Sequence, residues 1–233
     1  MFVISPLLKR LFACLPEQLY APVLFGKMRG SYWIPKSANP GQVIGRYEPE
    51  HEKILIELLA TSTVFWDVGA HVGWYSILAS KQMNGTIYSF EPNPENISYL
   101  KQHVRINKVS DINLVNKALS SSNGESYFSG EKQQGGLSET GTYKVKTITA
   151  DAFVKQEKII PDLIKMDIEG AETEFLQGAI ALLTNHQPKL ILSAHGYKKR
   201  DECVSFLIEL GYSINHIVSD ACAGDYVFSA IKR

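Results

Sequence analysis

The stretch that decides the fold spans residues 64–76 and reads Val-Phe-Trp-Asp-Val-Gly-Ala-His-Val-Gly-Trp-Tyr-Ser. The apolar run over residues 63–68 is typical of a buried strand, and residues 71–80 predict a helix. Gly69 and Gly73 permit a tight turn and a close approach of a ligand to the backbone. The start of the following helix offers unpaired N–H groups, so this strand, turn and helix predict a ligand site.

The rest of the chain repeats this alternation of strands and helices. Further strands are predicted over residues 85–90, 111–119, 144–149, 162–166, 189–193, 213–218 and 226–231. Further helices are predicted from Asn93-Pro94 onward, over residues 171–183, and around residues 204–208. The alternation predicts an α/β fold with a largely parallel sheet covered by helices on both faces. In such a fold the ligand lies beyond the carboxyl ends of the strands.

Two acids at consecutive strand ends discriminate between cofactors. Asp67 directly precedes the glycine turn, and Glu91 ends the second predicted strand. A dinucleotide site has the spacing G-x-G-x-x-G, whereas this turn has G-x-x-x-G. Asp67 would repel a pyrophosphate but suits the ammonium and sulfonium groups of S-adenosylmethionine (SAM), and Glu91 can accept both ribose hydroxyls. SAM is therefore the predicted cofactor. The alternatives are an NAD-dependent oxidoreductase or epimerase, and a SAM-binding protein without catalysis.

Four stretches together resemble the FkbM-type family of SAM-dependent methyltransferases. They are residues 64–76, Phe90-Glu-Pro-Asn93, Asn116-Lys-Ala-Leu119, and residues 164–172, which read Ile-Lys-Met-Asp-Ile-Glu-Gly-Ala-Glu. The resemblance extends from about Gly45 to about Gly211. It implies a class I methyltransferase (Rossmann-like) fold with a seven-stranded, mostly parallel sheet whose last strand is antiparallel. It also implies SAM as the methyl donor and a hydroxyl as the usual acceptor.

The resemblance also implies which residues hold the cofactor. The methionine and ribose would be lined by Asp67, Gly69, Ala70, His71 and Gly73. His71 stands where relatives frequently carry Asn, and either side chain can form a hydrogen bond with the cofactor.

The remaining cofactor residues follow the second and third strands. Glu91 would bind the ribose hydroxyls with Asn93 beside it, and Asn116 and Ala118 would approach the adenine. Asn116 also fits a purely structural turn amide, because Asn is common in turns.

Acidic residues and a histidine gather at the predicted reaction end. Asp167, Glu169 and Glu172 follow the fourth strand, and His195 closes the fifth. Either Asp167 or His195 would take the proton from an acceptor hydroxyl, and Glu169 or Glu172 would orient the pair. Glu172 also fits a structural acid in the first turn of a helix.

Two further expectations concern the same end of the sheet. Asp167 and Glu169 could share a divalent metal, since hard cations favour carboxylates. Because no third oxygen ligand is evident in the sequence, we expect no metal at this site. The Ser- and Gly-rich residues 120–141 predict hairpins or a mobile loop, and a candidate lid over the acceptor.

Composition narrows the classes of partner. Lys plus Arg and Asp plus Glu balance at 24 each, so there is no overall charge excess favouring nucleic acid. Cys14, Cys203 and Cys222 lie far apart without a metal-binding spacing, which favours reduced thiols and a cytoplasmic protein. The predicted acceptor is a small-molecule hydroxyl on a sugar, lipid-linked or polyketide-like natural product.

The first 45 residues are predicted to form a helical or irregular segment packed on a methyltransferase domain of residues 46–233. Ser5-Pro6 begins a predicted helix that Pro16 ends. Its apolar residues on one face are Leu7, Leu8, Leu11, Phe12 and Leu15. The helix is too short and too charged to span a membrane. It packs on the domain or makes a peripheral membrane or dimer contact.

Overall fold

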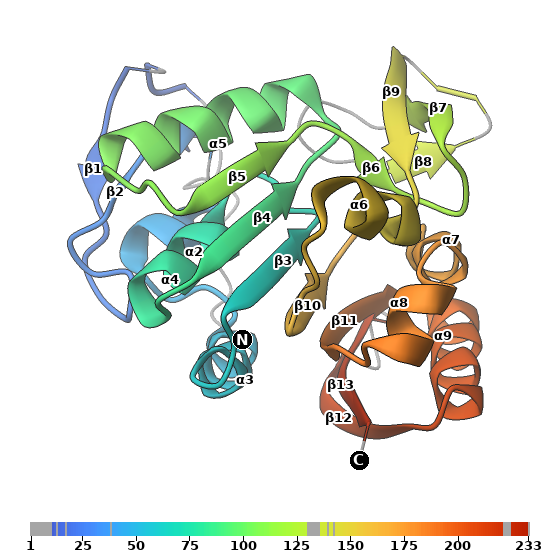
Figure 1. The fold of residues 1–233 in the computed structure, drawn as a ribbon. Helices are drawn as coiled ribbons and strands as arrows, with labels where there is room; N and C mark the ends of the chain where they lie inside the picture. The colour runs from blue at the N-terminus through green and yellow to red at the C-terminus, as the bar shows by residue number, and fades with distance from the viewer. Residues whose placement is uncertain are drawn as a thin grey trace.

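The computed structural model describes residues 11–232, except residues 13, 17, 38, 130–135, 139, 142 and 221–224. Its centre is a seven-stranded sheet of order β12-β13-β11-β10-β3-β4-β5 (Figure 1). The strands are β3 (Val64–Val68), β4 (Thr86–Phe90), β5 (Ile112–Val115), β10 (Leu163–Met166), β11 (Lys189–His195), β12 (Tyr212–Asp220) and β13 (Asp225–Lys232). All neighbouring pairs from β11 to β5 are parallel, and β13 runs antiparallel to both of its neighbours. The predicted class I methyltransferase fold is confirmed.

The register of the central strands brings their carboxyl ends to one edge. Val68 at the end of β3 is paired with Met166 of β10 on one side and Phe90 of β4 on the other. The residues that follow these three strands therefore meet at the same edge. They include Asp167 and Glu91.

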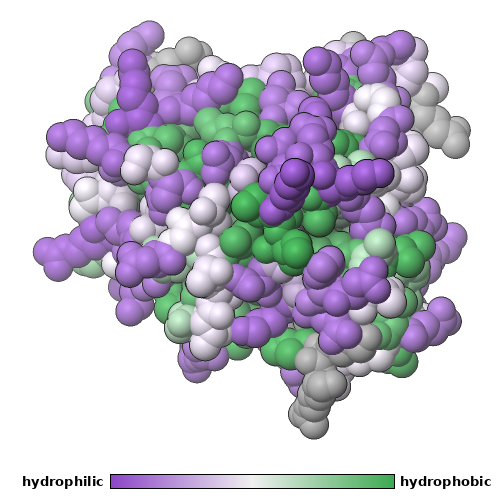
Figure 2. Space-filling model, in the orientation of Figure 1, coloured by the Kyte–Doolittle hydropathy of each residue, from purple (hydrophilic) through white to green (hydrophobic). Residues whose placement is uncertain are grey.

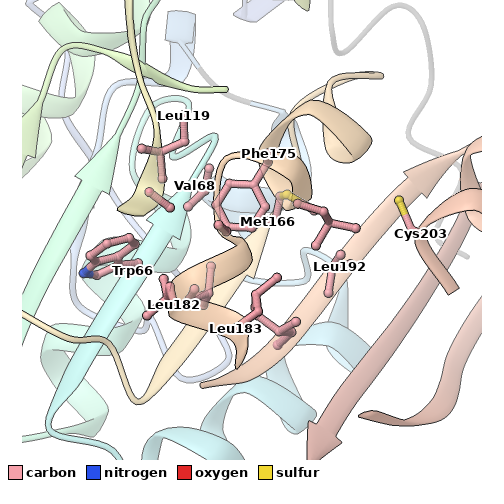
Figure 3. Close-up of a cluster of buried hydrophobic side chains, with 14 of the residues drawn as sticks. Trp66, Val68, Leu119, Met166, Phe175, Leu182, Leu183, Leu192 and Cys203 are labelled. Atoms are coloured by element: carbon pink, nitrogen blue, oxygen red, sulfur yellow. The ribbon is translucent and has the colours of Figure 1, made fainter. Parts of the chain in front are cut away.

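Helices cover both faces of this sheet, because successive strand residues point to opposite sides. Phe65 packs in one core with Leu55 and Ile77, whereas Trp66 packs in the other core with Phe175. Figure 3 shows the second core. The helices beside the first core are α3 (Pro49–Leu59), α4 (Trp74–Gln82) and α5 (Pro94–Ile106). Those beside the second are α6 (Ala150–Glu157), α7 (Glu172–Gln177), α8 (Ile180–Asn185) and α9 (Tyr197–Glu209).

The segment predicted as one third strand divides between two sheets. Residues 111–119 form β5 and then β6 (Ala118–Leu119), which belongs to a separate sheet of order β6-β9-β7-β8. Its other strands are β7 (Gly124–Ser129), β8 (Gly136–Ser138) and β9 (Tyr143–Ile148). The described part of residues 120–141 thus contains strands, which agrees with the prediction of hairpins in this segment. Residues 130–135 and 139 of the lid candidate lie outside the described residues.

Two predicted helices have different boundaries. The helix over residues 71–80 begins only at Trp74, because His71 and Gly73 have positive φ angles of 51° and 94°. The helix over residues 171–183 is broken into α7 and α8 around Gly178. A Cβ on Gly178 would lie 2.0 Å from the carbonyl oxygen of Ser120, so the backbones approach more closely there than a side chain allows.

The N-terminal segment packs against the main domain through buried aromatic contacts. Trp33 is fully buried and stacks on His103 of α5 at 3.9 Å between ring centroids. The His103 imidazole also accepts from the Ile34 N–H at 3.0 Å. Its elements are β1 (Ala21–Pro22), β2 (Tyr32–Trp33), η1 (Pro35–Ser37) and α2 (Pro40–Ile44). The helix predicted over residues 5–16 lies mostly outside the described residues.

No described helix is both long and apolar enough to cross a bilayer. The face of the molecule shown in Figure 2 is covered largely by polar side chains, with an apolar area near its centre.

Candidate active site

A cavity of about 630 Å³ opens at the carboxyl edge of the sheet. The glycine turn after β3 and the residues after β4 and β10 line its inner wall. Helices α4 and α5, the N-terminal segment with Tyr47, and the small sheet line the rest. Residues of these outer walls are Lys36, Ser37, Gln42, Tyr47, Phe128 and Leu137. The cavity therefore lies where the strand ends predicted a ligand.

The glycine turn is shaped by a close backbone approach. Gly69 has φ +80°, and a Cβ there would lie 1.9 Å from the carbonyl oxygen of Asp167. The N–H groups of Gly69 and Ala70 both donate to the Phe90 carbonyl at 3.0 Å. Gly69, Ala70 and His71 all line the cavity, and Gly69 has no side chain that could obstruct it.

Glu91 is buried, yet it lines the cavity. Its Oε2 accepts from the His71 N–H and its Oε1 from the Asn93 N–H, both at 2.8 Å. Burial raises the pKa of Glu91 to about 7, although these backbone hydrogen bonds and one from the Asn96 side chain act in the opposite direction. A carboxylate offers about four lone-pair sites, so it can still accept a hydroxyl. The arrangement fits a ribose beside this carboxylate.

Asp67 lies beneath the turn and does not line the cavity. It is fully buried, and its Oδ2 accepts from the Ser76 hydroxyl at 2.6 Å. Its Oδ1 is buried without a hydrogen-bond partner among the described residues. Burial raises the pKa of Asp67, whereas Lys165 and the hydrogen bond from Ser76 act to lower it. An unpartnered buried acceptor below the turn fits a cationic ligand above it.

Two of the predicted cofactor residues support the backbone beside Glu91. The Asn93 side chain caps α5 by accepting from the Glu95 N–H at 2.8 Å and the Asn96 N–H at 3.3 Å. The Asn116 amide donates to the Glu91 carbonyl at 2.8 Å. Neither Asn93 nor Asn116 lines the cavity. Their direct contact with a cofactor stays a prediction.

Ala118 does line the cavity, next to Lys117. Gly73 does not, and it begins α4 with its Cα against Leu100, whose Cδ1 would lie 2.1 Å from an added Cβ. Gly73 thus shapes the helix start rather than the cavity surface.

At the reaction end, Asp167 and Glu169 line the cavity and His195 contacts both. The His195 Nε2 lies 3.1 Å from Asp167 Oδ1 and 3.8 Å from Glu169 Oε2. Lys165 Nζ lies 3.5 Å from the other oxygen of Asp167. Burial alone would raise the pKa of Asp167, but Lys165 and then His195 hold it well below its usual range. Asp167 is therefore an ionised carboxylate with both oxygens oriented.

Glu172 is held in a different way from Asp167 and Glu169. It is fully buried, does not line the cavity, and accepts from the Gly170 N–H at 2.9 Å through Oε1. Burial raises the pKa of Glu172. This geometry fits the alternative role of Glu172 as a structural acid at the start of α7, and its role in orienting Asp167 and His195 stays a prediction.

Lys165 is the main cavity residue that sequence reasoning missed. It is buried, and its Nζ lies 4.8 Å from the centre of the Tyr75 ring. Burial acts to lower the pKa of Lys165, but Asp167 and Asp67 raise it above its ordinary value. The sequence did contain a signal for Lys165, because it lies within the apolar strand that precedes Asp167. A lysine buried in a strand needs a charged partner, and Asp167 is two residues away.

Asp167, Glu169 and His195 also have the spacing of metal ligands, because one donor atom from each lies within 4.8 Å of the others. Lys165 already supplies a positive charge to Asp167. The absence of a metal stays a prediction.

The fold and the cavity at its strand ends define a class I methyltransferase. Residues 67–214 match the methyltransferase FkbM domain family, so the chain belongs to that family. Methyltransferases of this family use SAM, and three features of the site fit that cofactor: the buried Asp67 Oδ1 without a hydrogen-bond partner among the described residues, the glycine turn and Glu91. This result rules out the NAD-dependent alternative.

Known relatives agree with this assignment. The chain is 31% identical over 142 residues to the hexuronic acid methyltransferase AglP of Haloferax volcanii. The match covers 57% of the chain and 56% of AglP, so the chain spans little more than half the length of that relative.

Solved structures show the same fold. Methyltransferase FkbM from Methylobacillus flagellatus superposes with a TM-score of 0.58 at 21% identity, over 72% of this chain and 43% of that one. The precorrin-6y C5,15-methyltransferase of Geobacter metallireducens superposes with a TM-score of 0.53 at 18% identity, over 79% of this chain and 88% of that one.

Proposed function

We propose that the protein transfers the methyl group of SAM to a hydroxyl of a small sugar-type acceptor. The observation that carries this proposal is the placement of Asp167. Its ionised carboxylate lines the cavity beside the glycine turn, with Lys165 on one oxygen and His195 on the other.

The cofactor residues act by position and charge. Glu91 binds the two ribose hydroxyls, and the turn of residues 69–71 contacts the methionine end of SAM. Asp67, beneath this turn, attracts the positively charged groups of the cofactor. The Asn93 N–H holds the Glu91 carboxylate, the Asn116 amide holds the Glu91 carbonyl, and Ala118 contacts the adenine.

When bound, the cofactor supplies a methyl group on a positively charged sulfur. Asp167 accepts a hydrogen bond from the acceptor hydroxyl and thereby turns an oxygen lone pair toward the methyl. The oxygen becomes strongly acidic as it gains the methyl, so Asp167 can take the proton despite its low pKa. Lys165 and His195 hold the carboxylate in place, and Glu169 borders the acceptor.

The acceptor class comes from the relative and from the charge of the cavity. AglP carries the name of a hexuronic acid methyltransferase, and a hexuronic acid has hydroxyls and a carboxylate. Asp167 and Glu169 would repel a carboxylate at the reaction end, which favours a hydroxyl as the nucleophile. We assign the acceptor wall to the lining residues at the junction of the N-terminal segment 1–45 with the domain 46–233, which are Lys36, Ser37, Asn39, Pro40, Gln42 and Tyr47.

We place the reaction in the cytoplasm, since Cys203 is a buried free thiol and Cys14 an exposed one. The remaining alternative is a SAM-binding protein without catalysis.

The test is transfer of an isotope-labelled methyl group to uronic acid glycosides and to matched neutral glycosides, with NMR of the product. The proposal expects a methyl ether on a ring hydroxyl. A methyl ester would move the nucleophile to the carboxylate. SAM binding without transfer to any glycoside would support the non-catalytic alternative.

A further inference from the structure

Exposed apolar side chains concentrate in one short part of the chain. Eleven large apolar side chains of the described residues are exposed, and six of them lie between residues 11 and 32. They are Leu11, Leu19, Tyr20, Leu24, Phe25 and Tyr32. Single exposed apolar residues are ordinary, whereas neighbouring ones can form an interaction surface, and Leu24 and Phe25 are adjacent in the chain.

The hairpin formed by β1 and β2 displays an adjacent exposed pair. Leu24 and Phe25 are 51% and 54% exposed, whereas Val23 and Met28 beside them are buried. The N–H groups of Leu24 and Phe25 donate to the carbonyls of Val43 and Ile44 at 3.3 and 3.1 Å. The pair is therefore held outward by backbone contacts with α2.

The same hairpin is positively charged. Lys27 and Arg29 are exposed at its tip, and the Arg46 guanidinium lies 5.8 Å from the centre of the Phe25 ring. The sequence of residues 18–32 contains neither Asp nor Glu. Lys27 has an acidic neighbour outside the hairpin, since Glu52 accepts a hydrogen bond from its backbone. The hairpin itself therefore carries cations without acids of its own.

Apolar side chains flanked by cations are typical of surfaces that lie in the headgroup region of an anionic bilayer. We favour the anionic bilayer over a protein partner because the cations of the hairpin, Lys27 and Arg29, have no acid within the hairpin to oppose an anionic surface. We propose that the hairpin of residues 19–32 docks the protein on an anionic membrane, with Leu24 and Phe25 inserted and Lys27 and Arg29 at the headgroups.

The position of the hairpin connects this surface to the cavity. Lys36 on the cavity wall follows the exposed Tyr32 by four positions, a span of at most about 14 Å along the chain. An acceptor carried on a lipid would thus be presented near the cavity. The contact itself does not depend on the proposed reaction.

The test is co-sedimentation of the full chain with vesicles of phosphatidylcholine, with and without phosphatidylglycerol. The double variant Leu24→Asp/Phe25→Asp should bind the anionic vesicles at least about tenfold more weakly than the wild type. The matched control is Ile180→Asp/Ile208→Asp, whose apolar side chains are 48% and 56% exposed elsewhere on the surface. The control should bind as the wild type does.

A second variant separates charge from insertion. Lys27→Glu/Arg29→Glu should reduce binding to anionic vesicles, and added salt should weaken the wild type. Circular dichroism verifies that each variant is folded. Methyl transfer to a water-soluble glycoside should be equal in all variants, so failure of docking is distinct from failure of the proposed function.

Three results would overturn the proposal. One is equal sedimentation of the wild type and the Leu24→Asp/Phe25→Asp variant. Another is wild-type binding that is the same with and without phosphatidylglycerol. The third combines two observations: the wild type does not bind vesicles, and light scattering shows a wild-type dimer that the Leu24→Asp/Phe25→Asp variant does not form. That result would assign the surface to a second copy of the chain.

Discussion

Substituting Gly69 by alanine tests whether the turn at the end of β3 is shaped by its contact with Asp167. The new Cβ would lie 1.9 Å from the Asp167 carbonyl oxygen at a φ of +80°. The left-handed backbone costs about 1–2 kcal/mol for a residue with a side chain. Overpacking against backbone that cannot move aside adds about 1–3 kcal/mol. We expect Gly69→Ala to lower the free energy of unfolding by about 2–5 kcal/mol.

Gly30 provides a matched control for this substitution. It has a φ of +83°, and a Cβ added there would have nothing within 4 Å. Gly30→Ala should therefore cost only the backbone part, about 1–2 kcal/mol. Urea unfolding measures both variants, and calorimetry measures SAM binding. Gly69→Ala should lose SAM affinity and Gly30→Ala should keep it. Equal stability and equal SAM affinity of the two variants would refute the close-approach argument.

Three further predictions concern charges around the cavity. Burial raises the pKa of Glu91 from 4.5 to about 7, so the folded protein should lose stability as the pH rises between these values. In the Glu91→Gln variant, the decrease in the free energy of unfolding over this pH range should be smaller by up to about 3 kcal/mol. Urea unfolding at a series of pH values measures it, and the same pH dependence in variant and wild type would contradict the prediction. Lys165→Met should lower the free energy of unfolding by about 3 kcal/mol, because Asp67 and Asp167 lose their shared cation; Lys155→Met on the surface of α6 is the control. Dialysis against EDTA should leave methyl transfer unchanged, since Lys165 already compensates Asp167, and activity that returns only with Mg²⁺ would show a metal at Asp167, Glu169 and His195.

The edge positions of the site could be predicted because they follow strand ends. Asp67, Glu91, Asp167 and His195 each stand at or directly after an apolar run, and parallel pairing brings such positions to one edge. The same pattern cannot distinguish a side chain facing the cavity from one beneath it. Asp67 therefore proved to lie under the turn rather than on its surface.

Other features depend on contacts that are distant in sequence. The break between α7 and α8 follows from the close approach of Gly178 to Ser120, which no local pattern records. Asn93 is a helix cap, and the Asn-Pro pair did signal that role. Lys165 was missed because a single lysine in an apolar strand does not alter the strand pattern.

The central claim is that Asp167 acts on the acceptor and not on the cofactor. The most direct test measures Asp167→Asn in parallel by calorimetry with SAM and by single-turnover methyl transfer to the best glycoside acceptor. The predicted result is SAM affinity close to that of the wild type with transfer slowed by at least about a hundredfold. Transfer at the wild-type rate would contradict the claim, and lost SAM binding would move Asp167 to the cofactor site.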